Sequence, residues 1–158
     1  MKLIKIMLLC ALAFALSPAL AQTKAATDNM QILREKLKAD KKLVVAANMD
    51  LTDAEAKKFW PVYDEYQAEL KKINERMGAL IVSYAKEYNA NSLTDENAKK
   101  MTNESIGIEE SEVKLKRSFV PKLGKALPGK KVARYFQIES KIRAVVKYEL
   151  ADNVPLVP

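Results

Sequence analysis

The chain has 158 residues, 49% of them hydrophobic and 30% charged, with a formal net charge of +7 at pH 7, no histidine and a single cysteine, Cys10. Histidine is the commonest general acid or base, and histidine and cysteine are the ligands that zinc and copper prefer. The composition therefore argues against most hydrolytic mechanisms and against a soft-metal site. We expect a protein that is not an enzyme and has no cofactor.

The first residues have the order of a secretory signal peptide. Lys2 and Lys5 precede an apolar run over 6–16, and small residues follow up to Ala21. The run is too short to span a bilayer as a helix. We expect cleavage after Ala21, location in the periplasm, and one helical domain over 22–158.

The alternative for the N-terminus is a lipoprotein modified at Cys10. This reading would place the modified cysteine inside the apolar run, behind the bulky residues Leu8 and Leu9. Cleavage after Ala21 would instead leave a chain without any thiol, and so without disulfides or thiol redox chemistry.

Apolar residues at steps of three and four, with one longer gap, predict a first amphipathic helix over about 28–47. After it, one short sequence occurs twice: Leu51-Thr52-Asp53-Ala54-Glu55 returns 42 residues later as Leu93-Thr94-Asp95-Glu96-Asn97. Thr52 and Thr94 are suitable N-caps, and Glu55 can complete a capping box with Thr52. Two helices are therefore predicted, over about 53–88 and 95–119.

The helix over 53–88 is predicted to carry a coiled-coil seam. Its apolar residues are spaced alternately three and four apart from Phe59 to Tyr88, which is the spacing of about four heptads. Pro61 cannot donate a hydrogen bond to the carbonyl of Lys57, so we expect a kink there or a division into two helices.

A short polar link over 89–92 predicts that the next helix runs back antiparallel, forming a long helical hairpin. Pro121 and Gly124 are expected to end that helix, and a last helix is expected over about 130–150. We find no strand pattern. The predicted fold is all-α, a single domain with a long antiparallel hairpin and additional N- and C-terminal helices.

Positive charge is concentrated near the C-terminus. The segment from Lys114 to Lys147, here called the basic block, holds 11 Lys or Arg residues and one acid, Glu139. Such a block attracts anionic surfaces, although part of it could instead pair with the acidic half of the chain. Export argues against nucleic acid as the partner, and the block has no recognised nucleic-acid-binding signature.

The densest aromatic group lies at the start of the second predicted helix. It is either part of the core or a surface that holds flexible partners, with methionines adding adaptable contacts. Trp60, beside the seam, is the aromatic residue most exposed to a partner on this reading. The candidate client-binding residues are Phe59, Trp60, Tyr63, Tyr66, Met77, Met101, Lys114, Arg117, Lys130, Lys131 and Arg134.

The paired Leu-Thr-Asp openings give the chain a resemblance to the Spy/CpxP-like periplasmic proteins, which repeat a Leu-Thr-x-x-Gln motif at helix starts. Glu55 and Asn97 stand here at the glutamine positions. The resemblance implies an all-helical, often dimeric protein that holds unfolded proteins without ATP or damps an envelope-stress sensor. The segment over 127–139 is also similar to stretches of exported helical proteins whose role is unassigned. The metal-binding branch of the family is not carried over, because the chain would have neither a histidine nor a thiol ligand after cleavage at Ala21.

Three functions remain open. The first is chaperone-like binding of unfolded or partly folded periplasmic proteins. The second is an envelope-stress regulator or adaptor with one folded partner. The third is binding to an anionic envelope surface, because a helix with an apolar face and a Lys/Arg rim can lie at a membrane interface. A homodimer is compatible with all three.

Overall fold

The computed structural model of the protein describes residues 40–158. Contacts divide the chain into two compact units, Met1–Val44 and Val45–Pro158. Of the first unit only 40–44 are described, and they are helical. The predicted signal peptide and most of the first predicted helix therefore lie outside the described residues. The part of that helix that is described ends at residue 49.

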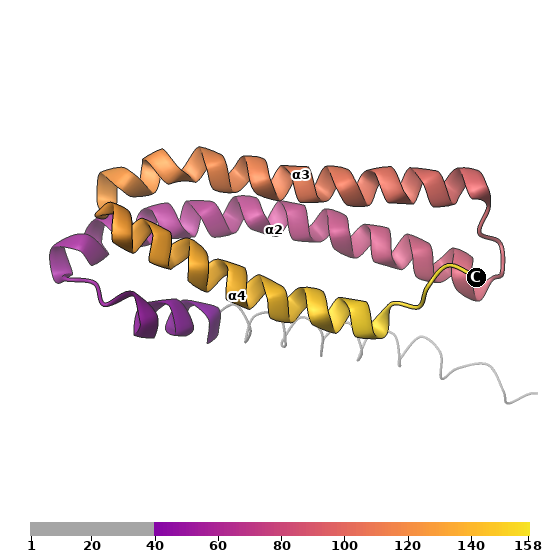
Figure 1. Ribbon diagram of the computed structural model, residues 1–158, viewed down its shortest axis with the longest axis horizontal. Coiled ribbons are helices and arrows are strands. Elements are labelled where there is room, and N and C mark those ends of the chain that lie inside the picture. The colour runs from indigo at the N-terminus through magenta and orange to yellow at the C-terminus, as the bar shows by residue number, and fades with distance from the viewer. Residues whose placement is uncertain (1–39) are drawn as a thin grey trace, which may run out of the picture. The chain divides into compact units, whose positions relative to one another are not determined.

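Three long helices follow in the second unit: α2 (Asp53–Asn89), α3 (Asp95–Ala126) and α4 (Gly129–Asn153). Figure 1 shows them lying alongside one another. Over residues 40–158 there is no strand, so the predicted all-α class is confirmed.

Contacts between side chains give the directions of the three helices. Between α2 and α3, Glu65 pairs with Lys122, and Arg76 pairs with Glu104. The residue numbers of the paired positions therefore increase along α2 while they decrease along α3. The two helices are therefore antiparallel. They are joined by a turn in which Asn91 has a φ of 49°, a left-handed conformation that asparagine tolerates better than most residues.

α4 runs in the same direction as α2. The ring of Tyr135 lies 6.1 Å from that of Tyr63 near the start of both helices. Further along, Arg143 donates a hydrogen bond of 2.8 Å to the side-chain oxygen of Asn74. At the far end, the Tyr84 hydroxyl donates to the carbonyl of Pro155, which anchors the C-terminal tail.

The hydrophobic core is concentrated at the end of the bundle where α2 and α4 begin and α3 ends. Its buried members are Val45, Met49, Phe59, Tyr63, Tyr66, Leu70, Phe119, Leu123, Leu127, Val132 and Tyr135. Among the described residues, no position over 74–107 or 140–158 is buried. This second region, here called the distal half, is consequently held by fewer apolar contacts and is the part expected to open most readily.

Prolines lie inside two of the long helices, and one sequence prediction about them, the end of the helix before Pro121, is wrong. α2 continues through Pro61 without division, and α3 continues through Pro121 and Gly124 to Ala126 instead of ending near residue 119. The extra turns of α3 bury Leu123 and bring Leu127 into the core. Burial of these leucines offsets the hydrogen bond that Pro121 cannot make. The kink expected at Pro61 stays a prediction.

Candidate binding surface

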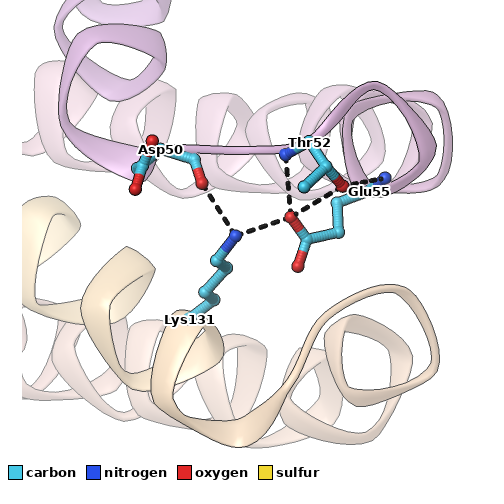
Figure 2. Close-up of polar contacts among 4 residues, drawn as sticks. All are labelled: Asp50, Thr52, Glu55 and Lys131. Atoms are coloured by element: carbon cyan, nitrogen blue, oxygen red, sulfur yellow. Dashed lines mark hydrogen bonds and ion pairs between the residues drawn. The ribbon is translucent and has the colours of Figure 1, made fainter.

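A polar cluster joins the start of α2 to the start of α4. Thr52 is the N-cap of α2, and both hydrogen bonds of a capping box with Glu55 are present. Figure 2 shows that the Lys131 ammonium reaches across from α4, 2.6 Å from a Glu55 carboxylate oxygen and 2.7 Å from the carbonyl oxygen of Asp50. Lys131 thus connects the start of α4 to the start of α2, and its charge is used within the fold.

This cluster also changes the acidity of its carboxylate. Hydrogen bonds from Lys131, and then from the Thr52 backbone, hold the pKa of Glu55 below its ordinary value of 4.5. The second cap is simpler. Thr94 accepts a hydrogen bond of 3.2 Å from the backbone of Asn97, whose side chain donates to Glu87 instead of returning to the cap.

Three aromatic residues predicted to contact clients are buried, which corrects the sequence analysis. Phe59, Tyr63 and Tyr66 are 0%, 3% and 1% exposed. Their rings pack edge-on around Tyr135 of α4, at centroid distances from 5.2 to 6.1 Å. A fully covered ring cannot contact a partner without unfolding of the site, so these residues form core.

Burial also affects the acidity of this aromatic group. Removal from water, followed by the nearby charge of Glu139, raises the pKa of the Tyr63, Tyr66 and Tyr135 hydroxyls above the ordinary value of 10. Tyr135 accepts a hydrogen bond from Gln67, which also donates to Glu139. Tyr135 therefore belongs to a hydrogen-bonded polar group in the core, and the three tyrosines stay neutral over the physiological range.

Trp60 is the half-buried member of the aromatic group. Its ring lies 5.0 Å from Phe59 and 5.3 Å from Tyr63, in both cases edge to face. Its outer side lines an open, shallow depression together with Asp53, Ala56, Lys57 and Pro61. Of the predicted aromatic contacts, Trp60 alone keeps a side accessible. The predicted methionines, Met77 and Met101, are half-buried in the distal half.

About half of the basic block is used internally. Lys114, Lys122, Lys131, Arg143 and Lys147 each pair with a glutamate. The pair of Lys114 with Glu110 is loose, at 3.9 Å, and exposed. Within the described part of the chain, the cations of the block that have no ion pair are Lys116, Arg117, Lys125, Lys130, Arg134 and Lys141.

Three of these cations share a line on α4 with two exposed apolar residues. Lys130, Arg134, Lys141, Val145 and Tyr148 are all exposed, and the last two are 63% and 72% accessible. Their steps of four, seven, four and three residues place them on one side of a helix, opposite the buried Val132, Tyr135 and Glu139. We call this row the α4 outer face.

The α4 outer face is only partly the site that the sequence predicted. Lys130 and Arg134 were among the candidates, whereas Val145 and Tyr148 were not. The signal in the sequence is the helical spacing of four, seven, four and three residues from Lys130, which places these residues on one side of the helix. Of the remaining candidates, Lys114 and Arg117 are exposed on α3.

Comparisons with protein-family models, with curated proteins and with solved structures find no match to this chain. Over residues 40–158, no helix has both the length and the apolar character that crossing a membrane would require. The function is therefore argued from the surface itself.

Proposed function

We propose that this is an exported, non-enzymatic protein that binds unfolded or partly folded envelope proteins without ATP, and that the α4 outer face is the surface that holds them. The observation that carries the proposal is the continuity of the row: three cations with no ion pair in the described chain, followed on the same side of the helix by Val145 and Tyr148.

The row suits weakly specific capture in two steps. Cations that are not neutralised internally create a field that attracts acidic segments and speeds their encounter. Exposed apolar and aromatic side chains then remove apolar client surface from water, at about 25 cal/mol for each Å² covered. Trp60 and the half-buried methionines of the distal half supply further contacts to longer clients.

Suppression of aggregation tests the proposal. An acidic client is unfolded and diluted into buffer, and its light scattering is followed with and without stoichiometric protein at low and moderate salt. We expect suppression that weakens as salt rises, because exposed charges are screened. The proposal fails if scattering is unchanged at both salt concentrations.

Matched variants locate the surface. Arg134→Glu with Lys141→Glu reverses two charges on the α4 outer face and should abolish most of the suppression. The control is Lys86→Glu with Lys99→Glu, which changes the net charge equally at exposed positions on α2 and α3 and should preserve it. Equal loss in both variants would show that net charge alone acts, and would remove the α4 outer face from the proposal.

A second candidate is supported by the same row. A helix face with Lys and Arg beside apolar and tyrosine side chains is also suited to the interface of an anionic membrane. Co-sedimentation with vesicles that contain anionic lipid, compared with neutral vesicles, distinguishes this function from client binding. The remaining alternative, a regulator or adaptor with one folded partner, predicts a single dominant species in a pull-down from periplasmic extract, whereas a chaperone predicts a mixture.

A further inference from the structure

A second row of exposed apolar side chains lies on α3. Ile106, Val113 and Val120 are 52%, 55% and 48% exposed. They are seven residues apart, so they fall nearly in line along the helix. The core-facing side of α3 buries Ile108, Phe119 and Leu123 against the rest of the bundle. We call the exposed row the α3 outer stripe.

The charges beside the α3 outer stripe change sign at its centre. Glu109 and Glu110 lie between Ile106 and Val113, and Lys116 and Arg117 lie between Val113 and Val120. In the described chain neither Lys116 nor Arg117 has an ion pair. The acids are held only by exposed partners, Glu109 by Lys147 at 2.9 Å and Glu110 by Lys114 at 3.9 Å.

We infer that the α3 outer stripe binds the same stripe of a second copy of this chain, in antiparallel orientation about a two-fold axis at Val113. Val113 then meets its own counterpart, and Ile106 of each copy meets Val120 of the other. A two-fold axis of this kind keeps each flank of one helix beside the same flank of the other. Glu110 therefore faces Arg117 of the second copy on one flank, and Glu109 faces Lys116 on the other.

The charge pattern selects this orientation over the parallel one. In a parallel pair, Glu109 and Glu110 of one copy would lie beside the same acids of the other, and Lys116 and Arg117 beside the same bases. Every flanking contact would then be repulsive, whereas in the antiparallel pair every one is attractive. The sign change about Val113 thus makes the stripe complementary to itself in one direction only.

The size of the contact determines the kind of dimer. From Ile106 to Val120 the stripe is about 21 Å long at 1.5 Å per residue. One helix-on-helix contact of this length is smaller than a standard stable interface. We therefore expect a reversible dimer that forms as concentration rises and dissociates as salt screens its flanking charges. The inference does not depend on the proposed function, because the α3 outer stripe and the α4 outer face have no residue in common.

Sedimentation velocity of the purified protein over a range of concentrations tests the dimer. Val113→Asp places an acid on the two-fold axis and should weaken association by about tenfold or more, because two like charges would meet in the contact. The control is Val82→Asp, at a 70% exposed valine on α2, which should leave association unchanged. A protein that is monomeric at every concentration, or that dimerises equally well with Val113→Asp, overturns the inference.

Charge reversal gives a second readout that a folding defect would not mimic. A chain with Glu109→Lys and Glu110→Lys, and another with Lys116→Glu and Arg117→Glu, should each fail to self-associate. Mixed in equal amounts they should form a heterodimer, because one stripe is then entirely basic and the other entirely acidic. Absence of a heterodimer between two folded variants overturns the charge argument.

Cross-linking with a short bismaleimide fixes the orientation, in a background in which Cys10→Ser removes the native thiol. Val113→Cys should cross-link to itself. Ile106→Cys should not, because its two copies would be about 21 Å apart, but it should cross-link to a chain carrying Val120→Cys. Self-cross-linking of Ile106→Cys would indicate a parallel pair and overturn the proposal.

Discussion

Glu112 of α3 and Arg143 of α4 form an ion pair of 2.6 Å in which only 6% and 16% of the two side chains are exposed. The same guanidinium donates to Asn74 of α2, so one side chain connects all three long helices. This connection lies where the core ends and the distal half begins. A buried pair of this kind contributes less to net stability than to fixing which positions on the helices face each other.

Removal of one partner from this pair is expected to be costly. Glu112→Ala leaves the Arg143 charge covered and uncompensated, and we expect the free energy of unfolding in urea to fall by about 3 kcal/mol or more. The double variant Glu112→Leu with Arg143→Met should recover most of the loss, because no charge is then buried. In the exposed pair with Lys100, Glu96→Ala should cost less than about 1 kcal/mol. A loss for Glu112→Ala as small as the loss for Glu96→Ala would contradict the argument.

The starts of α2 and α3 could be predicted from sequence because caps are local. Thr52 with Glu55, and Thr94 with the backbone of Asn97, act within one turn, so a few residues carry the whole signal. The end of α3 could not be predicted, because the local preference of Pro121 for a break competes with burial of Leu123, which depends on contacts distant in sequence. Helix ends that are decided by packing lie beyond local reasoning.

The candidate site likewise combines features that local sequence patterns predict with features that depend on long-range packing. Spacing identified the aromatic residues that share a side of α2, but it could not tell which side α4 would cover. Phe59 and Tyr63 are covered, whereas Trp60 is only half-buried. The cations of the basic block were visible in the sequence, whereas the separation of paired Lys131 from unpaired Lys130 depends on where Glu55 lies. The resemblance to Spy/CpxP-like proteins stays a prediction.

Because of the capping cluster, the stability of the fold is expected to decrease at low pH. Since Lys131 lowers the pKa of Glu55 in the folded state, the stabilisation is present above the unfolded value of 4.5 and is lost as pH falls through the lower folded value. Glu55→Gln should therefore lower the melting temperature at pH 7, and the difference from the unsubstituted protein should narrow below pH 4.5. Thr94→Ala removes a cap that contains no carboxylate, so the decrease in melting temperature that it causes should not depend on pH in this window. A constant difference for Glu55→Gln would contradict the prediction.

Because of the buried tyrosines, the stability of the fold is expected to decrease at high pH. Burial raises the pKa of Tyr63, Tyr66 and Tyr135, so they stabilise the fold below the unfolded value of 10, and the contribution is lost as pH rises beyond it. With three protons bound more tightly in the folded state, the free energy of unfolding should fall with a slope that approaches about 4 kcal/mol per pH unit at about pH 11 and above, where the unfolded tyrosines are ionised.

Denaturant titrations from about pH 9 to about pH 12 measure this slope. Tyr66→Phe should reduce it by about one third, or about 1.4 kcal/mol per pH unit, because it removes one of the three protons. Absorbance at high pH gives an independent reading, since these hydroxyls should ionise only with unfolding. Ionisation of all six tyrosines near pH 10 in a folded protein would refute the assignment.

Adjacent aromatic residues should differ in what they contribute to stability. Phe59→Ala opens a cavity at a position with no exposed surface, and we expect a loss of about 3–5 kcal/mol in unfolding free energy. Trp60→Ala removes a side chain that is already in partial contact with water, and the loss should be about half as large. Guanidinium denaturation followed by circular dichroism measures both. Equal losses would place Trp60 in the core and remove it from the accessible surface.

The proline inside α3 is expected to be a site where stability can be gained. Pro121 is exposed and cannot donate to the carbonyl of Arg117, so Pro121→Ala restores a helical hydrogen bond and should raise the free energy of unfolding by about 1–3 kcal/mol. Gly124→Ala, where an added Cβ would meet no atom within 4 Å, should add about 1 kcal/mol by restricting the unfolded chain. The two gains, measured by urea denaturation, should be close to additive. A loss of stability for Pro121→Ala would mean that the packing of Phe119 and Leu123 needs the geometry that proline imposes.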